Sequence, residues 1–246
     1  MSQLDSVDRE IEILHILQRK PSLRSWYREI YGKYENCMKR IPKKGKVVEL
    51  GSGGGFAKEV IPELVTTDIL PYRNVDCVVD ATYMPFETSS IRGLFLCNVF
   101  HHISDVHRFF QEATRCLVSG GRLLIVDQNV GWLSKPILKY IHREPFDEKA
   151  KEWTFMSTGP LSGANGALAW IVFQRDRATF HAQYPTLHFD RVEFHTPLRY
   201  WLSGGLTPFN LLPLPLYAFA TFFDRLLLKV SPQFGSFLDI ELVCLK

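Results

Sequence analysis

The feature that most constrains this chain is a glycine-rich segment, Glu49-Leu-Gly-Ser-Gly-Gly-Gly55. The β-branched run 46–50 leads into it and predicts a strand, and residues 56–61 after it predict a helix. Glycines let the backbone adopt positive φ and let a ligand approach without a Cβ in the way. A strand, a glycine bend and a helix in this order are typical of nucleotide-binding α/β folds.

The pattern continues along the chain as an α/β fold. Further strands are predicted over 65–69, 75–79, 91–99 and 122–127, with a helix after Ser104 between the last two. Strands that alternate with helices at short spacing form βαβ units and a parallel sheet. A sixth strand is expected near 187–194, and the alternating segment 236–246 predicts a final, antiparallel strand.

Two helices are predicted before the first strand. Asp5 and Ser6 can cap the first, which ends at Pro21, and the second ends before Pro42. About 110 residues separate Asp127 from the final strand, too many for simple connections. We therefore expect one more helix over 133–142 and two insertions, 145–185 and 197–235.

Composition excludes several classes of protein. A net charge of +3 with 22% charged residues is too mild a bias for nucleic-acid binding, so we expect no nucleic-acid partner. Five cysteines without a Cys-x-x-Cys pair favour reduced, buried thiols and a cytoplasmic location. The acidic N-terminus does not look like an export signal, and no apolar run of about 18 residues predicts a membrane-spanning helix.

Two kinds of nucleotide cofactor compete for the glycine segment. A dinucleotide site requires Gly-x-Gly-x-x-Gly, and although Gly51 and Gly53 fit, Phe56 stands at the third position. Glu49 would repel a pyrophosphate but attract a cofactor that carries an ammonium and a sulfonium. Nicotinamide-dependent redox chemistry is therefore disfavoured.

The segment resembles motif I of the class I S-adenosylmethionine-dependent methyltransferases. The resemblance continues in order for about 85 residues and includes an acidic residue 17 positions after Gly51, which in this family holds the ribose hydroxyls. The further matching landmarks are Asp68, the pair Asp80-Ala81, the segment from Asn98 to His102, and Arg115-Cys-Leu-Val-Ser-Gly-Gly-Arg122, in which Ser119 replaces the family's proline.

The resemblance implies a Rossmann-like three-layer α/β sandwich with a mostly parallel seven-stranded sheet, an antiparallel last strand and insertions late in the chain. It implies one domain: N-terminal helices over 1–42, a cofactor-binding core over 43–144, acceptor-side insertions over 145–185 and 197–235, and the last strand. The implied cofactor is S-adenosyl-L-methionine. The residues implied to bind it are Glu49, Gly51, Gly53, Gly55, Asp68, Ile69, Asp80, Ala81 and Asn98.

Most of these residues also follow the carboxyl ends of predicted strands, where open α/β sheets bind ligands in one crevice. Simpler roles stay open for some of them. Asp68 or Asp80 could cap a turn, and Gly54 could serve turn geometry alone. Ser119 with the two glycines after it could simply end a helix.

His102 is the candidate catalytic base, because histidine titrates near neutral pH. The alternative is that His101 and His102 only approach a helix, one packed and one solvated. The Asn/Asp-Pro-Pro-Tyr/Phe segment of amino-methylating relatives is missing, which favours an oxygen acceptor, with carbon second. Acidic residues do not cluster, so no metal site is expected, and Asp127 is a lone candidate for one.

The segment 205–230 is unusually apolar for a surface connection. It could form a lid over the acceptor, mediate dimerisation or lie in a membrane interface. The sequence thus predicts a methyltransferase of the class EC 2.1.1 that acts on a small-molecule, sugar or lipid-linked acceptor, either in the cytoplasm or peripherally on a membrane. The oligomeric state stays open. The alternative function is a cofactor-binding scaffold or interaction subunit without catalysis.

Overall fold

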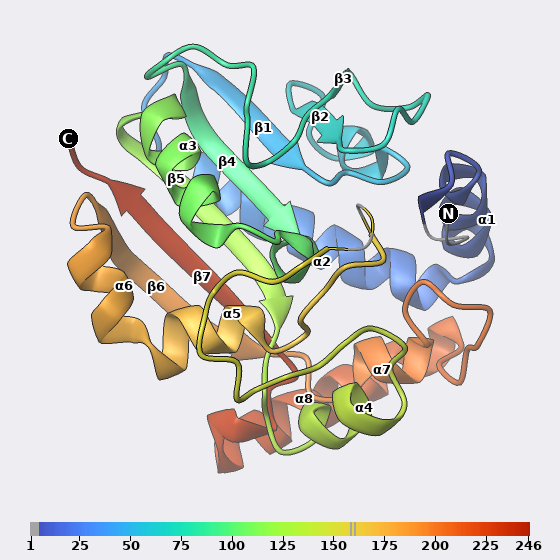
Figure 1. Ribbon diagram of the computed structural model, residues 1–246. Helices are drawn as coiled ribbons and strands as arrows, with labels where there is room; N and C mark the ends of the chain where they lie inside the picture. The colour runs from blue at the N-terminus through green and yellow to red at the C-terminus, as the bar shows by residue number, and fades with distance from the viewer. Residues whose placement is uncertain (1–4, 158, 160) are drawn as a thin grey trace.

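A computed structural model describes residues 5–157, 159 and 161–246. The chain forms one seven-stranded sheet with the order β3-β2-β1-β4-β5-β7-β6 (Figure 1). β7 is antiparallel to both of its neighbours, whereas the β1–β2, β2–β3, β1–β4 and β4–β5 pairs are parallel. The strands are β1 Lys46–Leu50, β2 Val65–Asp68, β3 Cys77–Val78, β4 Ile91–Cys97, β5 Leu117–Gln128, β6 Leu187–His195 and β7 Phe237–Cys244.

Helices cover both faces of the sheet and produce the three layers predicted from the sequence. Helix α2 (Pro21–Met38) packs on one face with α1 (Arg9–Arg19) against it, and α3 (Val106–Cys116) packs on the other face with the helical segments 168–183. The remaining elements are α4 Ser134–Tyr140, α5 Leu168–Trp170, α6 Arg177–Gln183, α7 Arg199–Ser203 and α8 Tyr217–Val230, with short helical turns over Phe56–Glu59, Phe100–His102, Ile171–Arg175, Leu214–Leu216 and Pro232–Phe234.

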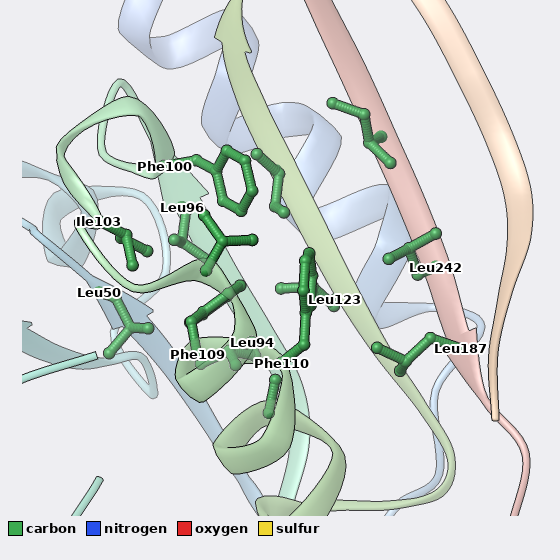
Figure 2. Close-up of a cluster of buried hydrophobic side chains, with 14 of the residues drawn as sticks. Leu50, Leu94, Leu96, Phe100, Ile103, Phe109, Phe110, Leu123, Leu187 and Leu242 are labelled. Carbon is green, nitrogen blue, oxygen red and sulfur yellow. The ribbon is translucent and has the colours of Figure 1, made fainter. Parts of the chain in front are cut away.

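The central strands are buried on both sides and supply two cores. Leu94 and Leu96 of β4 face the core beneath α3, and Phe95 between them faces the aromatic core beneath α2. This alternation follows from the two-residue period of a strand. Figure 2 shows the first core, in which Phe109 and Phe110 of α3 lie against the leucines of β4 and β5. Both cores end at the carboxyl edge of the strands, where the candidate site residues lie.

Three local predictions differ from the structure. The helix expected over 56–61 is a single 3-10 turn, Phe56–Glu59, and Pro62, which cannot continue a helix, follows closely. Strand five begins at Leu117 rather than 122, because the chain passes directly from α3 into β5 and Gly120 takes a φ of +77° there. Asp5 does not cap the first helix, since its carboxylate accepts hydrogen bonds from the backbone N–H groups of Leu161 and Ser162.

Within the described part of the chain, every helix is too short or too polar to cross a membrane.

The packing of α3 predicts a large difference between two phenylalanine truncations. Phe110 is fully buried and its ring contacts those of Phe173 and Phe180, whereas Phe222 is 61% exposed. Phe110→Ala should lower the free energy of unfolding by ~3–5 kcal/mol. Phe222→Ala should change it by less than ~0.5 kcal/mol. Urea unfolding measures both, and equal losses at the two positions would contradict this packing.

Candidate active site

The glycine bend follows β1 at the carboxyl edge of the sheet. Gly51, Gly53 and Gly55 have φ values of +69°, +55° and +71°, which residues with a Cβ rarely adopt. A Cβ added at Gly51 would lie 2.3 Å from a methyl carbon of Val99, and one at Gly55 would lie 2.3 Å from the carbonyl oxygen of Asn74. The bend therefore needs glycine both for its conformation and for the close approach of its neighbours.

Asp68, the last residue of β2, is joined directly to this bend. Its Oδ2 accepts a hydrogen bond from the backbone N–H of Gly53 at 3.0 Å, and its Oδ1 accepts one from Leu70 at 3.1 Å. Burial raises the pKa of this carboxyl above its usual range. Ile69, the next residue, is partly exposed. The structure thus brings Asp68 and the glycines together, as the sequence predicts.

Glu49 and Asn98 stand beside the bend with buried polar atoms that lack partners. Glu49 Oε2 and both amide atoms of Asn98 make no hydrogen bond within the described residues. Burial raises the pKa of Glu49 to about 7. A buried polar group without a partner costs ~1–3 kcal/mol, so such groups mark a place that a polar ligand can satisfy. Asn98 also has a φ of +56°, a strained backbone that is frequent at functional sites.

Asp80 caps a local turn, the simpler of the two roles considered from the sequence. Its carboxylate accepts hydrogen bonds from the backbone N–H and the hydroxyl of Thr82, both at 2.7 Å, and closes a local turn. Asp80 is exposed and Ala81 is partly buried. Their contact with a cofactor stays a prediction.

His101 is a buried imidazolium held between two carboxylates. Its Nδ1 lies 2.6 Å from Asp127 Oδ1, and its Nε2 lies 3.1 Å from Glu144 Oε2. Burial alone would lower the pKa of His101, but Asp127 and Glu144 outweigh burial and raise it to about 10. The expectation of one packed and one solvated histidine does not describe this pair, because both side chains are at most 14% exposed.

His102, in contrast to His101, is a neutral imidazole. Burial, together with the positive charge of His101, lowers the pKa of His102 to about 4. Its Nδ1 lies 3.1 Å from the carbonyl oxygen of Gly163 and donates to it. The lone pair is therefore on Nε2, which lies 3.7 Å from Glu144 Oε1. A neutral imidazole with a free ring nitrogen beside a carboxylate can accept a proton.

Several polar residues at this edge were not singled out as partners of these histidines from the sequence. The only indication in the sequence that Asp127 has a functional role is its position at the end of β5. Glu144 lies in an irregular segment, and nothing in the sequence indicates a role for it. Tyr200 of α7 is buried nearby, and burial raises the pKa of its hydroxyl, with a further contribution from Glu144. His142, whose Nδ1 is 3.6 Å from Glu144 Oε2, completes the group.

His101, His102 and Glu144 have ligand atoms within 4.8 Å of one another, a spacing that can hold a metal ion. Their charges already balance in another way, since the His101 imidazolium faces two carboxylates. In this protonation state Nε2 of His101 carries a proton and cannot bind a metal. The arrangement therefore favours proton handling.

The comparisons with known proteins identify the core. Residues 48–125, about a third of the chain, match the model of the methyltransferase domain family. This part of the chain is similar to a methyltransferase domain. No curated protein sequence matches the chain. S-adenosyl-L-methionine, the cofactor predicted from the sequence, is the one that methyltransferases of this class use.

Solved structures share the fold at low sequence identity. A chain from the Haloferax volcanii complex between the Trm112 methyltransferase activator and a methyltransferase has a TM-score of 0.53 and 14% identity, covering 100% of this chain and 99% of the other. A geranyl diphosphate methyltransferase in complex with S-adenosylmethionine has a TM-score of 0.51 and 15% identity, covering 99% and 93%. These likenesses confirm the predicted fold class.

The His101 pair predicts how stability depends on pH. The pKa of His101 is raised from 6.5 to about 10 on folding, so the stabilisation is complete below pH 6.5 and is lost as the pH rises through 10. Over this window the free energy of unfolding should fall more steeply in the native protein than in His101→Gln, by at most ~1.4 kcal/mol per pH unit. Parallel curves from urea titrations at several pH values would rule out the charged pair.

Proposed function

We propose that this chain is an S-adenosylmethionine-dependent methyltransferase that methylates an oxygen atom of a small-molecule, sugar or lipid-linked acceptor. The observation that carries the proposal is the buried carboxyl of Glu49, whose Oε2 has no partner within the described residues, beside a glycine bend that Asp68 fixes. A carboxylate in this position is stabilised by a cation, and the cofactor carries both an ammonium and a sulfonium.

The residues at the strand ends fit the cofactor. Glu49 and Asn98 supply polar atoms that lack partners, the bend supplies backbone without a Cβ, and Asp68 supplies a carboxylate at its edge. When bound, the cofactor supplies a methyl group that is already activated for transfer. The protein then has to orient the acceptor and, for a hydroxyl, remove its proton.

His102 is the residue that would take this proton, at Nε2. Its low pKa keeps it neutral across the physiological range, and the carboxylate of Glu144 would stabilise the imidazolium that forms. The carbonyl oxygen of Gly163 holds the His102 ring through Nδ1, and His101, itself held by Asp127, fixes Glu144. The same low pKa makes His102 a weak base, which suits an acidic hydroxyl such as a phenol or an enol better than a simple alcohol.

Cofactor affinity should depend on the ionisation of Glu49. Because the pKa of Glu49 is about 7, its carboxylate form increases between pH 6 and pH 8. The affinity for S-adenosylhomocysteine, which carries the same ammonium, should rise about tenfold over this range. Isothermal calorimetry measures it, and Glu49→Gln, which cannot ionise, should bind more weakly and with little pH dependence. Native protein that binds NAD and not S-adenosylhomocysteine would refute the assignment.

Turnover should depend on His102 without a matching loss of cofactor binding. His102→Gln should lower kcat about 10²-fold or more and leave the affinity for S-adenosylhomocysteine unchanged, because the residue handles a proton. In the native enzyme the acidic limb of kcat/KM should fall near pH 4 rather than near 6.5. The readout is transfer of radiolabelled methyl groups to a panel of phenolic, sugar and lipid acceptors. Unchanged turnover would reduce His102 to a structural role.

The non-catalytic scaffold gives a different result in the same two experiments. It would bind S-adenosylhomocysteine but transfer no methyl group to any acceptor. Dialysis against a chelator separates proton handling from metal chemistry at the histidines, because it should leave turnover unchanged if His102 acts as a base.

A further inference from the structure

Helix α8 presents its apolar side to the solvent. Its buried residues are Ala220 and Asp224, one turn apart. On the opposite side, Phe219, Phe222, Leu226 and Val230 are 63%, 61%, 47% and 71% exposed. Their spacing of three and four residues places them on one continuous stripe. A helix at an ordinary water-facing surface has the reverse arrangement, with its apolar stripe toward the core.

A charged network fixes this orientation. The carboxylate of Asp224 accepts hydrogen bonds from the backbone N–H of Leu198 at 2.7 Å and from Nε of Arg199 at 2.6 Å. Nη1 of Arg199 donates in turn to both carboxylate oxygens of Glu29, each at 2.8 Å. Turning α8 to bury its apolar stripe would expose Ala220 and strip buried charges of their partners, which is costly.

The apolar surface continues into the chain that precedes α8. We define the docking face as the exposed large apolar residues of this region: Phe209, Leu211, Leu214, Leu216, Phe219, Phe222, Phe223, Leu226 and Val230. Contiguous exposed apolar surface of this kind marks an interaction site.

The exposed charges of α8 are positive. Between residues 195 and 236 the sequence has one acidic residue, Asp224, which is buried against Arg199, whereas Arg225 and Lys229 are exposed. The neighbouring segment 130–143 around α4 contains Lys135, Lys139 and Arg143, of which Lys135 pairs with Glu148.

This segment also adds exposed apolar side chains next to the docking face. Trp132, Tyr140 and Ile141 are 60%, 75% and 74% exposed. The ring of Trp132 contacts that of Phe234, shortly after α8, with centroids 5.0 Å apart. In Figure 1, α4 and α8 occupy the same end of the molecule.

We propose that the docking face lies on the surface of a membrane that contains anionic lipid. Aromatic and leucine side chains that project from a cationic border are the composition of helices that lie in a membrane interface. A second copy of the chain is a poorer occupant, because a symmetric contact would bring the Arg225 and Lys229 side chains of two molecules together.

The membrane surface also explains where an acceptor would come from. Trp201 of α7 contacts the histidine cluster, with its ring 6.0 Å from that of His142, and α7 packs against α8. The histidine cluster therefore lies next to the elements that carry the docking face, which favours a lipid or lipid-linked acceptor. This last step rests on the proposed function, whereas membrane binding does not.

Flotation with vesicles tests the proposal without cofactor or acceptor. The native chain should bind vesicles of equal parts phosphatidylcholine and phosphatidylglycerol and bind phosphatidylcholine alone much more weakly. Phe219→Ser/Phe222→Ser should lower the bound fraction about tenfold or more, and Arg225→Gln/Lys229→Gln should lower it several-fold, an effect that high salt reproduces. Tyr83→Ser is the matched control, because Tyr83 is 72% exposed but lies after β3, away from the face. It should bind like the native chain.

Unchanged urea unfolding curves of all variants show that each still folds. Native protein that ignores anionic vesicles would overturn the proposal, and so would serine variants that bind them equally well. Light scattering tests whether a second copy of the chain occupies the docking face. A native protein that is a dimer, and a serine variant that is a monomer, would assign the face to a second copy. Failure of methyl transfer would leave vesicle binding intact, so the two proposals fail separately.

Discussion

The buried carboxylate of Glu49 is the feature on which the interpretation of the carboxyl edge of the sheet depends. It sits at the end of β1 with one oxygen unpaired, and burial raises its pKa to about 7. Folding alone would favour an apolar residue here. The strain at Asn98 and the three left-handed glycines add to this local cost. Each of these features lowers the stability of the fold. Binding of a polar, cationic ligand at this edge would offset that cost.

The two histidines show how neighbouring residues of one type acquire different chemistry. His101 lies between Asp127 and Glu144 and stays charged, whereas His102 is buried next to that charge and stays neutral. The shared partner, Glu144, holds the charged ring and faces the free nitrogen of the neutral one. Environment rather than residue type separates the positioning group from the candidate base.

The sequence predicted most strands and their alternation with helices, because hydrophobic periodicity is a local signal. The glycine bend and Asp68 were also readable, since their spacing follows from adjacent parallel strands. Glu144 could not be predicted as a site residue, because it lies in an irregular segment and contacts His101 only in the folded structure. The start of β5 was misplaced because Ser119 and the two glycines after it were expected to end the preceding helix, whereas they lie within the strand.

The insertions show the same limit more clearly. Their apolar composition was evident from the sequence, but a lid, a dimer contact and a membrane contact share that composition. The direction of α8 separates a lid from the other two roles, and it depends on Asp224 pairing with Arg199, 25 residues away. A lid buries its apolar stripe over the acceptor, whereas α8 turns this stripe outward.

The most direct measurement for the central claim is a crystal structure of the chain with S-adenosylhomocysteine. The account predicts the ligand's amino group within hydrogen-bond distance of the Glu49 carboxylate, its ribose hydroxyls at Asp68, and its backbone contacts along Gly51–Gly55. A ligand bound elsewhere, with Glu49 still unpaired beneath an undisturbed bend, would contradict it.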